Sequence, residues 1–196
     1  METEVIYQNQ FQKEYFLADS KGKIDIILSN YPTFQHQLSG IEKGIKLDIK
    51  VDQDFRFRKE KGDLGIRVQT TGLLDPTARE AIRNVELDRA FDENDLEKEL
   101  EKTSEPDVFR KQILMLHSMM EDYLIIQAVI EALPFQDGNT LNDFFTHQRN
   151  REQLTQVAKD RQIEVRTIYQ KVWRVKNRIR MDVIDKFERK YGRRPA

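Results

Sequence analysis

The chain has 196 residues, of which 38% are hydrophobic and 34% charged, which is enough apolar content for a folded core and excludes the disordered class. It contains no cysteine, which excludes disulfides and thiolate metal sites. Its net charge of -1 hides an uneven distribution, because residues 1–146 carry 18 Lys and Arg against 28 Asp and Glu, whereas residues 147–196 carry 15 against 6.

The basic C-terminal segment is of the kind that attracts phosphate through Coulomb steering and counterion release. A solvated helical face explains the same charges equally well, so charge alone leaves both interpretations open. We expect an acidic body over residues 1–133 and a basic module over residues 140–196. The N-terminal residues METEVIYQNQ lack the apolar segment of a secretory signal, and no stretch approaches the roughly 20 apolar residues of a membrane span. A cytoplasmic protein outside the membrane is therefore expected.

The first fifty residues predict helix, with breaks. Residues 1–23 suggest a short helix or an arm that closes in a turn at 20–23, and the apolar run from Ile24 should end or kink at Pro32. Helical spacing resumes at Leu38 and Ile41. Residues 45–51 alternate apolar and polar side chains on top of that spacing, so helix and strand both remain open there.

The next segment predicts short extended pieces followed by a helix. Residues 55–58 alternate Phe and Arg, which is typical of a half-buried strand, although stacking on single-stranded nucleic acid is an alternative. Residues 65–70 also read as extended. A helix should begin near Pro76, since Asp75 or Thr77 can cap it and Thr77 with Glu80 matches a capping box.

The acidic stretch over residues 92–99 is expected to be a solvated helix or linker. Carboxylate spacing alone is unspecific and no histidine lies nearby, so a metal site is not predicted. A long helix should then run from about Pro106 to Leu133, where Pro134 stops it. Its apolar side chains repeat every three or four residues, which indicates a core helix or, alternatively, a homodimer seam; they are Phe109, Ile113, Leu116, Met120, Tyr123, Gln127 and Ile130.

Residues 153–172 have the spacing of a helix-turn-helix. Ala158 is small enough for two helices to cross closely, Ile163 would plug the turn, and Ile168 and Val172 would return to the same core from the second helix. The complete predicted core is Leu154, Val157, Ala158, Ile163, Ile168 and Val172. The fold class expected for the whole chain is therefore mainly α, with a helical body that can include short strands and a C-terminal helix-turn-helix module.

Once these residues face inward, the start of the second helix is left to meet duplex DNA. Arg166 and Gln170 are the predicted base readers, because guanidinium matches guanine O6 and N7 and the amide matches adenine. Thr167 and Tyr169 lie beside them. The predicted phosphate contacts are basic: Arg149, Arg151, Arg161, Lys171, Arg174, Arg178, and also Lys176 and Arg180. Trp173 fits either the edge of the module or the DNA backbone.

Two residues depart from the usual motif. Gln162 stands at the turn position where glycine is common, and Glu164 stands where Ser or Thr usually caps the second helix. An ordinary helical hairpin would share the apolar spacing. The coincidence of that spacing with the basic segment favours DNA binding.

Three elements together resemble the phage late-transcription regulators of the RinA and ArpU type. They are residues 30–38, residues 65–82, which run from Gly65-Ile-Arg-Val into Asp75-Pro-Thr-Ala, and the C-terminal helix-turn-helix, which is similar to the promoter-reading region of sigma factors. The resemblance implies a transcription activator that binds duplex promoter DNA in the bacterial host cytoplasm. It also implies contact with host RNA polymerase and activation of packaging and structural genes.

The sequence bears on two other classes of protein. A phage DNA-packaging small subunit also combines a helix-turn-helix with an oligomerising helix. An enzyme is not expected, because the three histidines, His36, His117 and His147, lie far apart in sequence. The chain also has no P-loop and no dinucleotide glycine pattern, so no cofactor and no metal is predicted.

Overall fold

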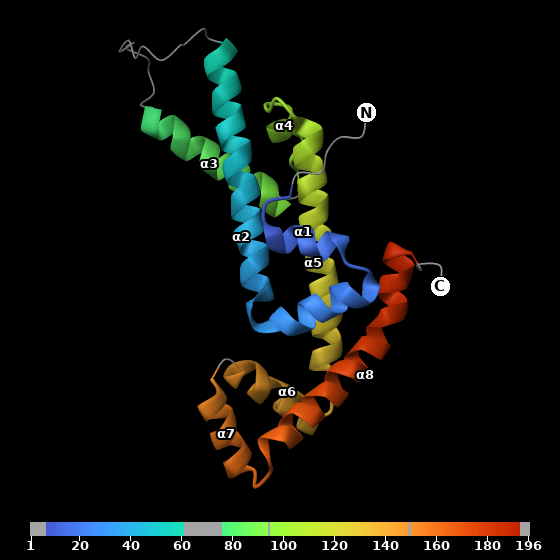
Figure 1. Cartoon of the computed structure of the whole chain (residues 1–196). Coiled ribbons are helices and arrows are strands. Elements are labelled where there is room, and N and C mark those ends of the chain that lie inside the picture. Colours follow the sequence, from blue (N-terminus) through green and yellow to red (C-terminus); the bar gives the residue numbers. More distant parts are fainter. Residues whose placement is uncertain (1–6, 61–75, 94, 149, 193–196) are drawn as a thin grey trace. The chain divides into compact units, whose positions relative to one another are not determined.

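The computed structural model describes residues 7–60, 76–93, 95–148 and 150–192, and every regular element within them is an α-helix (Figure 1). The mainly α class is thus confirmed. The extended piece predicted at residues 65–70 lies outside the described residues. The side chains proposed to cap the next helix, in residues 75–80, are not described either. The helices are α1 (Gln10–Leu17), α2 (Ser20–Glu60), α3 (Pro76–Glu93), α4 (Glu97–Leu100), α5 (Pro106–Glu131), α6 (Phe135–His147), α7 (Arg151–Asp160) and α8 (Val165–Tyr191).

The prediction of a strand at residues 55–58 is wrong, because these residues are helical. Residues 45–51, for which the sequence left helix and strand open, are helical too. Both segments belong to α2. Ile41, Ile45 and Ile49 are buried at intervals of four residues, so the helical spacing and not the alternation matches the core. Phe55 is 62% exposed, which shows that the Phe and Arg alternation does not describe one buried face.

Helix α2 also begins earlier and continues further than the sequence suggested. Residues 20–23 are its first turn and not a loop, because the Asp19 carboxylate accepts a hydrogen bond from the Gly22 amide at 2.8 Å and caps the helix. Pro32 lies inside α2 without ending it. The Asn30 side chain bonds the Ile26 carbonyl at 2.9 Å, and the neighbouring Phe34 is fully buried. Packing of this segment offsets the roughly 3 kcal/mol that an internal proline costs.

The described residues form two compact units that do not follow the predicted boundary between residues 133 and 140. One unit holds the chain up to Gln8 together with residues 41–115, and the other holds residues 9–40 together with 116–196. The difference arises because the long helices α2 and α5 each contribute a segment to both units. The basic C-terminal helices therefore share a unit with α1, the start of α2 and the second half of α5.

The first unit is held by apolar packing with polar contacts around it. Its buried residues include Leu87 of α3 and Leu100 of α4. The Gln53 amide donates to the Glu99 carbonyl at 2.8 Å, and Lys46 pairs with Asp88 at 3.0 Å. The acidic segment is thus packed in part, and not simply the solvated helix or linker expected.

In the second unit, α8 ends in a clamp that we define as Tyr15, Asp122, Lys190 and Tyr191. The fully buried Asp122 accepts hydrogen bonds from Tyr15 at 2.5 Å, from Lys190 at 3.1 Å and from the Tyr191 hydroxyl. Burial and the nearby Asp122 carboxylate raise the pKa of Tyr15 far above its ordinary value. Burial and a hydrogen bond to Asp122 raise the pKa of Tyr191 to about 12.

Helix α5 is a helix as predicted, and much of its apolar seam lies in the core. Phe109, Ile113, Leu116 and Tyr123 are buried, whereas Met120 is 39% exposed. Contrary to the sequence expectation, α5 is long and apolar enough to cross a membrane by length and composition, and among the described residues it is the one helix that is. Helix α5 also carries the buried Asp122, which is bonded to three partners in its own unit. The homodimer alternative stays a prediction.

Candidate nucleic-acid interface

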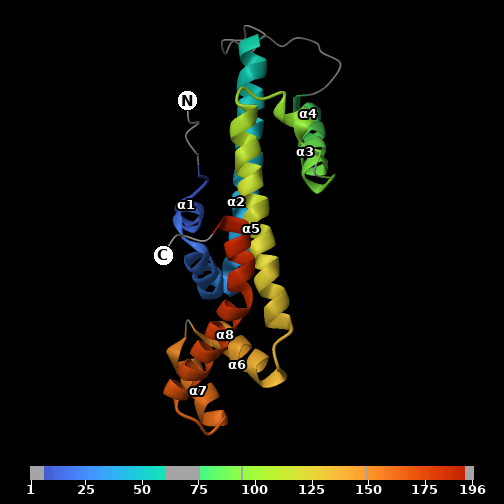
Figure 2. The same ribbon diagram turned by 90° about the vertical axis from the view of Figure 1, so that its right-hand side faces the viewer.

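Three consecutive helices, α6, α7 and the first half of α8, pack against one another (Figures 1 and 2). Of the six predicted core residues, Leu154, Ala158, Ile168 and Val172 are buried, while Val157 and Ile163 are only half-buried. The sequence interpretation missed Leu141 and Val175, which complete the core. Leu141 belongs to α6, which begins immediately after Pro134.

The turn between α7 and α8 has the geometry that usually calls for glycine. Gln162 has φ 54°, the left-handed region, and among the described non-glycine residues it alone has a positive φ. The conformation costs about 1–2 kcal/mol for a residue with a Cβ. The Ile163 amide donates to the Ala158 carbonyl at 2.9 Å and closes the turn. The apolar spacing thus located the turn correctly, although glycine is absent from it.

The two helix starts differ in their caps. Asn150 caps α7, since its side chain accepts from the amides of Glu152 at 3.0 Å and Gln153 at 3.2 Å. Glu164 has the extended backbone of an N-cap, but its side chain makes no capping hydrogen bond. A glutamate carboxylate is one carbon too far from the backbone to cap well. The first turn of α8 is therefore held by packing, with its amides open at one end.

The outer face of α8 gathers most of the predicted readers. Arg166, Gln170 and Arg174 are exposed, and they line one shallow hollow of about 600 Å³ together with Tyr169 and Trp173. The buried Val172 and half-buried Lys176 also contact this hollow. Intervals of three and four residues along α8 place these side chains on one face, opposite Ile168 and Val175. Trp173, for which the sequence left two locations open, lies on this face.

Aromatic side chains of α6 flank the hollow. Phe144 meets the Tyr169 ring edge-on with 5.7 Å between centroids. Lys176 places its ammonium 5.2 Å from the Phe144 centroid and 5.4 Å from that of Phe145. Burial lowers the pKa of Lys176. Lys176 is therefore engaged with α6, not extended toward solvent as a phosphate contact requires.

The predicted basic contacts fall into two groups. Arg161 pairs with Asp143, Arg178 pairs with Asp137 at 3.4 Å, and Arg180 pairs with Asp25. In the described part of the chain no ion pair involves the exposed side chains Arg151, Arg166, Lys171 and Arg174.

Two further residues were predicted to contact DNA, Thr167 and Arg149. Thr167 is half-buried, and its amide donates to the Glu164 carbonyl at 2.9 Å. Arg149 lies outside the described residues. The unpaired cations thus gather in α7 and the first half of α8.

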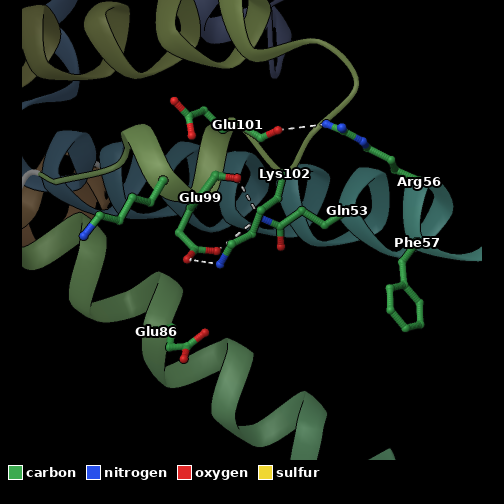
Figure 3. Close-up of a pocket in the computed structure, with 8 residues that line it drawn as sticks. Gln53, Arg56, Phe57, Glu86, Glu99, Glu101 and Lys102 are labelled. Atoms are coloured by element: carbon green, nitrogen blue, oxygen red, sulfur yellow. Dashed lines mark hydrogen bonds and ion pairs between the residues drawn. The ribbon is translucent and has the colours of Figure 1, made fainter. Parts of the chain in front are cut away.

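A larger hollow of about 880 Å³ lies in the first unit between α2 and α4 (Figure 3). Several of its polar groups are already engaged: Arg56 donates to the Glu101 carbonyl at 2.8 Å, and Lys102 donates to the Glu99 carboxylate at 2.5 Å. Cations and carboxylates alternate around it, so it has no excess charge that would select a ligand. The hollow on α8 is the better functional candidate.

Comparison with protein-family models, curated proteins and solved structures finds no match to this chain.

Proposed function

We propose that this protein binds duplex DNA in a sequence-specific manner, with the N-terminal half of α8 entering the major groove. The observation that carries the proposal is the exposed face of α8, which presents Gln170 together with Arg166 and Arg174. Neither arginine forms an ion pair with the described residues, and the face lies beside a packed α7, turn and α8. A major groove about 12 Å wide accepts a single helix presented in this way.

The side chains divide into readers and anchors. Arg166 and Gln170 lie in the first two turns of α8, where a recognition helix meets base edges. Arg174 and Lys171 lie further along and on the flank, where phosphates run beside the groove. Arg151, at the start of α7, adds a further exposed cation for a phosphate contact. Residues 147–196 carry 15 Lys and Arg against 6 Asp and Glu, and this excess of positive charge supports affinity for the phosphate backbone of DNA.

The resemblance to the RinA and ArpU regulators extends the proposal to biology. On that basis the protein activates late genes of a phage or prophage in the bacterial cytoplasm by working with host RNA polymerase. It acts as a binding protein without a catalytic step, cofactor or metal. The acidic first unit offers a surface for a protein partner.

The test is selection of a preferred site from a random duplex library, followed by affinity measurements at several salt concentrations. Arg166→Ala should relax the preference at one base pair, where a bidentate contact contributes about 1–3 kcal/mol of discrimination. Arg174→Ala should weaken binding to all sequences alike and lower the salt slope by about 1.

Arg189→Ala is the matched control, because Arg189 is an exposed arginine in the last turn of the same helix. We expect it to leave both the base preference and the affinity nearly unchanged. Equal effects of Arg166→Ala and Arg174→Ala on every sequence would contradict base reading by α8. Failure to recover any preferred duplex would overturn the proposal as a whole.

A further inference from the structure

Trp173 is the least explained side chain on the proposed DNA-binding face. It is 65% exposed, and among the described residues no ring or cation contact engages it. One exposed apolar side chain is common on protein surfaces and carries no conclusion by itself. Its position does, because Trp173 lies three residues after Gln170 and seven after Arg166, in line with both predicted readers.

The surroundings of Trp173 define the chemistry of what it can meet. The hollow beside it has the apolar Val172 at its base and the exposed cations Arg166 and Arg174 at its rim. A partner that fits must be apolar at the centre and negatively charged around it. In the major groove of DNA, the C5 methyl group of thymine is the apolar group on a base edge, and phosphates flank it on both sides.

We propose that Trp173 makes the protein specific for thymine at one position of its DNA site, by packing against the thymine C5 methyl group in the major groove. The inference deepens the function proposed above and rests on it. Arg166 and Gln170 then read hydrogen-bonding edges, while Trp173 reads shape and apolar surface on the same helix face.

Stacking of Trp173 on an unpaired base is the other use of an exposed indole. Stacking platforms need access to the flat face of a base, which a helix inside the major groove of an intact duplex does not have. The neighbouring aromatic ring offers no second platform, since Tyr169 is held edge-on by Phe144. The arrangement therefore favours duplex DNA and the methyl group.

The experiment uses the full chain and the duplex recovered by selection, in which each thymine is replaced singly by deoxyuridine, which lacks only the C5 methyl. For the unaltered protein, one such replacement per bound copy should weaken binding about fourfold, the effect of removing one buried methyl group. Trp173→Ala should bind the thymine and uracil duplexes equally at that position, and Trp173→Phe should restore part of the difference.

Met181→Ala is the matched control, because Met181 is 67% exposed on α8 but does not line the hollow. It should keep full sensitivity to uracil, as should Arg166→Ala. Sequence-specific duplex binding that ignores every uracil substitution would overturn this inference and leave duplex recognition standing, whereas a preference of the protein for the single strand would overturn the proposed duplex binding as well. Absence of any DNA binding would overturn both.

Discussion

The two halves of α8 carry similar basic residues but use them differently. In the first half, Arg166 and Arg174 are exposed and without internal ion pairs among the described residues. In the second half, Arg180 pairs with Asp25, and Lys190 pairs with Glu121 at 2.7 Å and with the buried Asp122. Two basic side chains of the second half are thus held by carboxylates of other helices, whereas Arg166 and Arg174 in the first half point to solvent.

The apolar residues follow the same division. Trp173 is 65% exposed, whereas Phe187 is fully buried. Burial lowers the pKa of Lys190, but hydrogen bonds to Glu121 and Asp122 outweigh burial and raise it. The difference teaches that total charge does not locate a binding surface, because a cation that already has a carboxylate partner contributes little net attraction to phosphate.

The largest expected effect comes from exchanging aromatic residues in the two halves for alanine. Phe187→Ala should lower the free energy of unfolding by about 3–5 kcal/mol, since it empties a fully buried ring site. Trp173→Ala should change it by less than about 0.5 kcal/mol, because the side chain is exposed. Urea unfolding followed by circular dichroism measures both.

Phe187→Leu keeps this test informative if Phe187→Ala does not fold, because an apolar swap of similar volume costs less than about 1.5 kcal/mol. The Phe187→Leu protein should retain the base preference of the unaltered chain. Similar losses of stability from Trp173→Ala and Phe187→Ala would remove the contrast between the halves.

A smaller effect should appear at alkaline pH and belongs to the clamp. The pKa of Tyr191 is about 12 in the folded protein and about 10 when unfolded, so its contribution to stability is complete below pH 10 and is lost as the pH rises toward 12. Because the ring is half-exposed, we expect a loss of about 1 kcal/mol and not the full value of the shift. Urea unfolding at pH 9 and pH 11 should show a smaller decrease for Tyr191→Phe than for the unaltered chain. An identical decrease in both proteins would show that Tyr191 does not couple to folding.

The smallest expected effect concerns the first turn of α8, which no side chain caps. Glu164→Asp keeps the charge and brings the carboxylate within reach of the first amides of α8, so the free energy of unfolding should rise by up to about 1 kcal/mol. Glu152→Asp is the control, because Asn150 already caps α7 and no gain is expected. Equal changes from the two substitutions would mean that the first turn of α8 does not lack a cap.

The sequence was most informative where local spacing and packing agree. The crossing of α7 and α8 at Ala158 and the left-handed turn at Gln162 follow from spacing alone, and the structure has both. Prediction failed where distant residues decide. Pro32 was expected to end or kink the helix, and it does not end α2. The burial of Phe34 beside it is not visible in a local pattern.

The residues of the candidate site were likewise predicted in part. Spacing placed Arg166 and Gln170 on an exposed face. It could not reveal that Arg161 and Arg178 meet Asp143 and Asp137, because those carboxylates lie 18 and 41 residues away in the chain. Pairing across such separations is set by how α6 packs on α7 and α8.

Helix α8 is unbroken from Val165 to Tyr191, a rod of about 40 Å at 1.5 Å per residue. A rod of this kind transmits rotation as well as position: each residue inserted between the clamp and Arg174 would turn the reading face by about 100° around the helix axis. The clamp at Asp122 therefore sets the direction, around the helix axis, in which Arg166, Gln170 and Trp173 face.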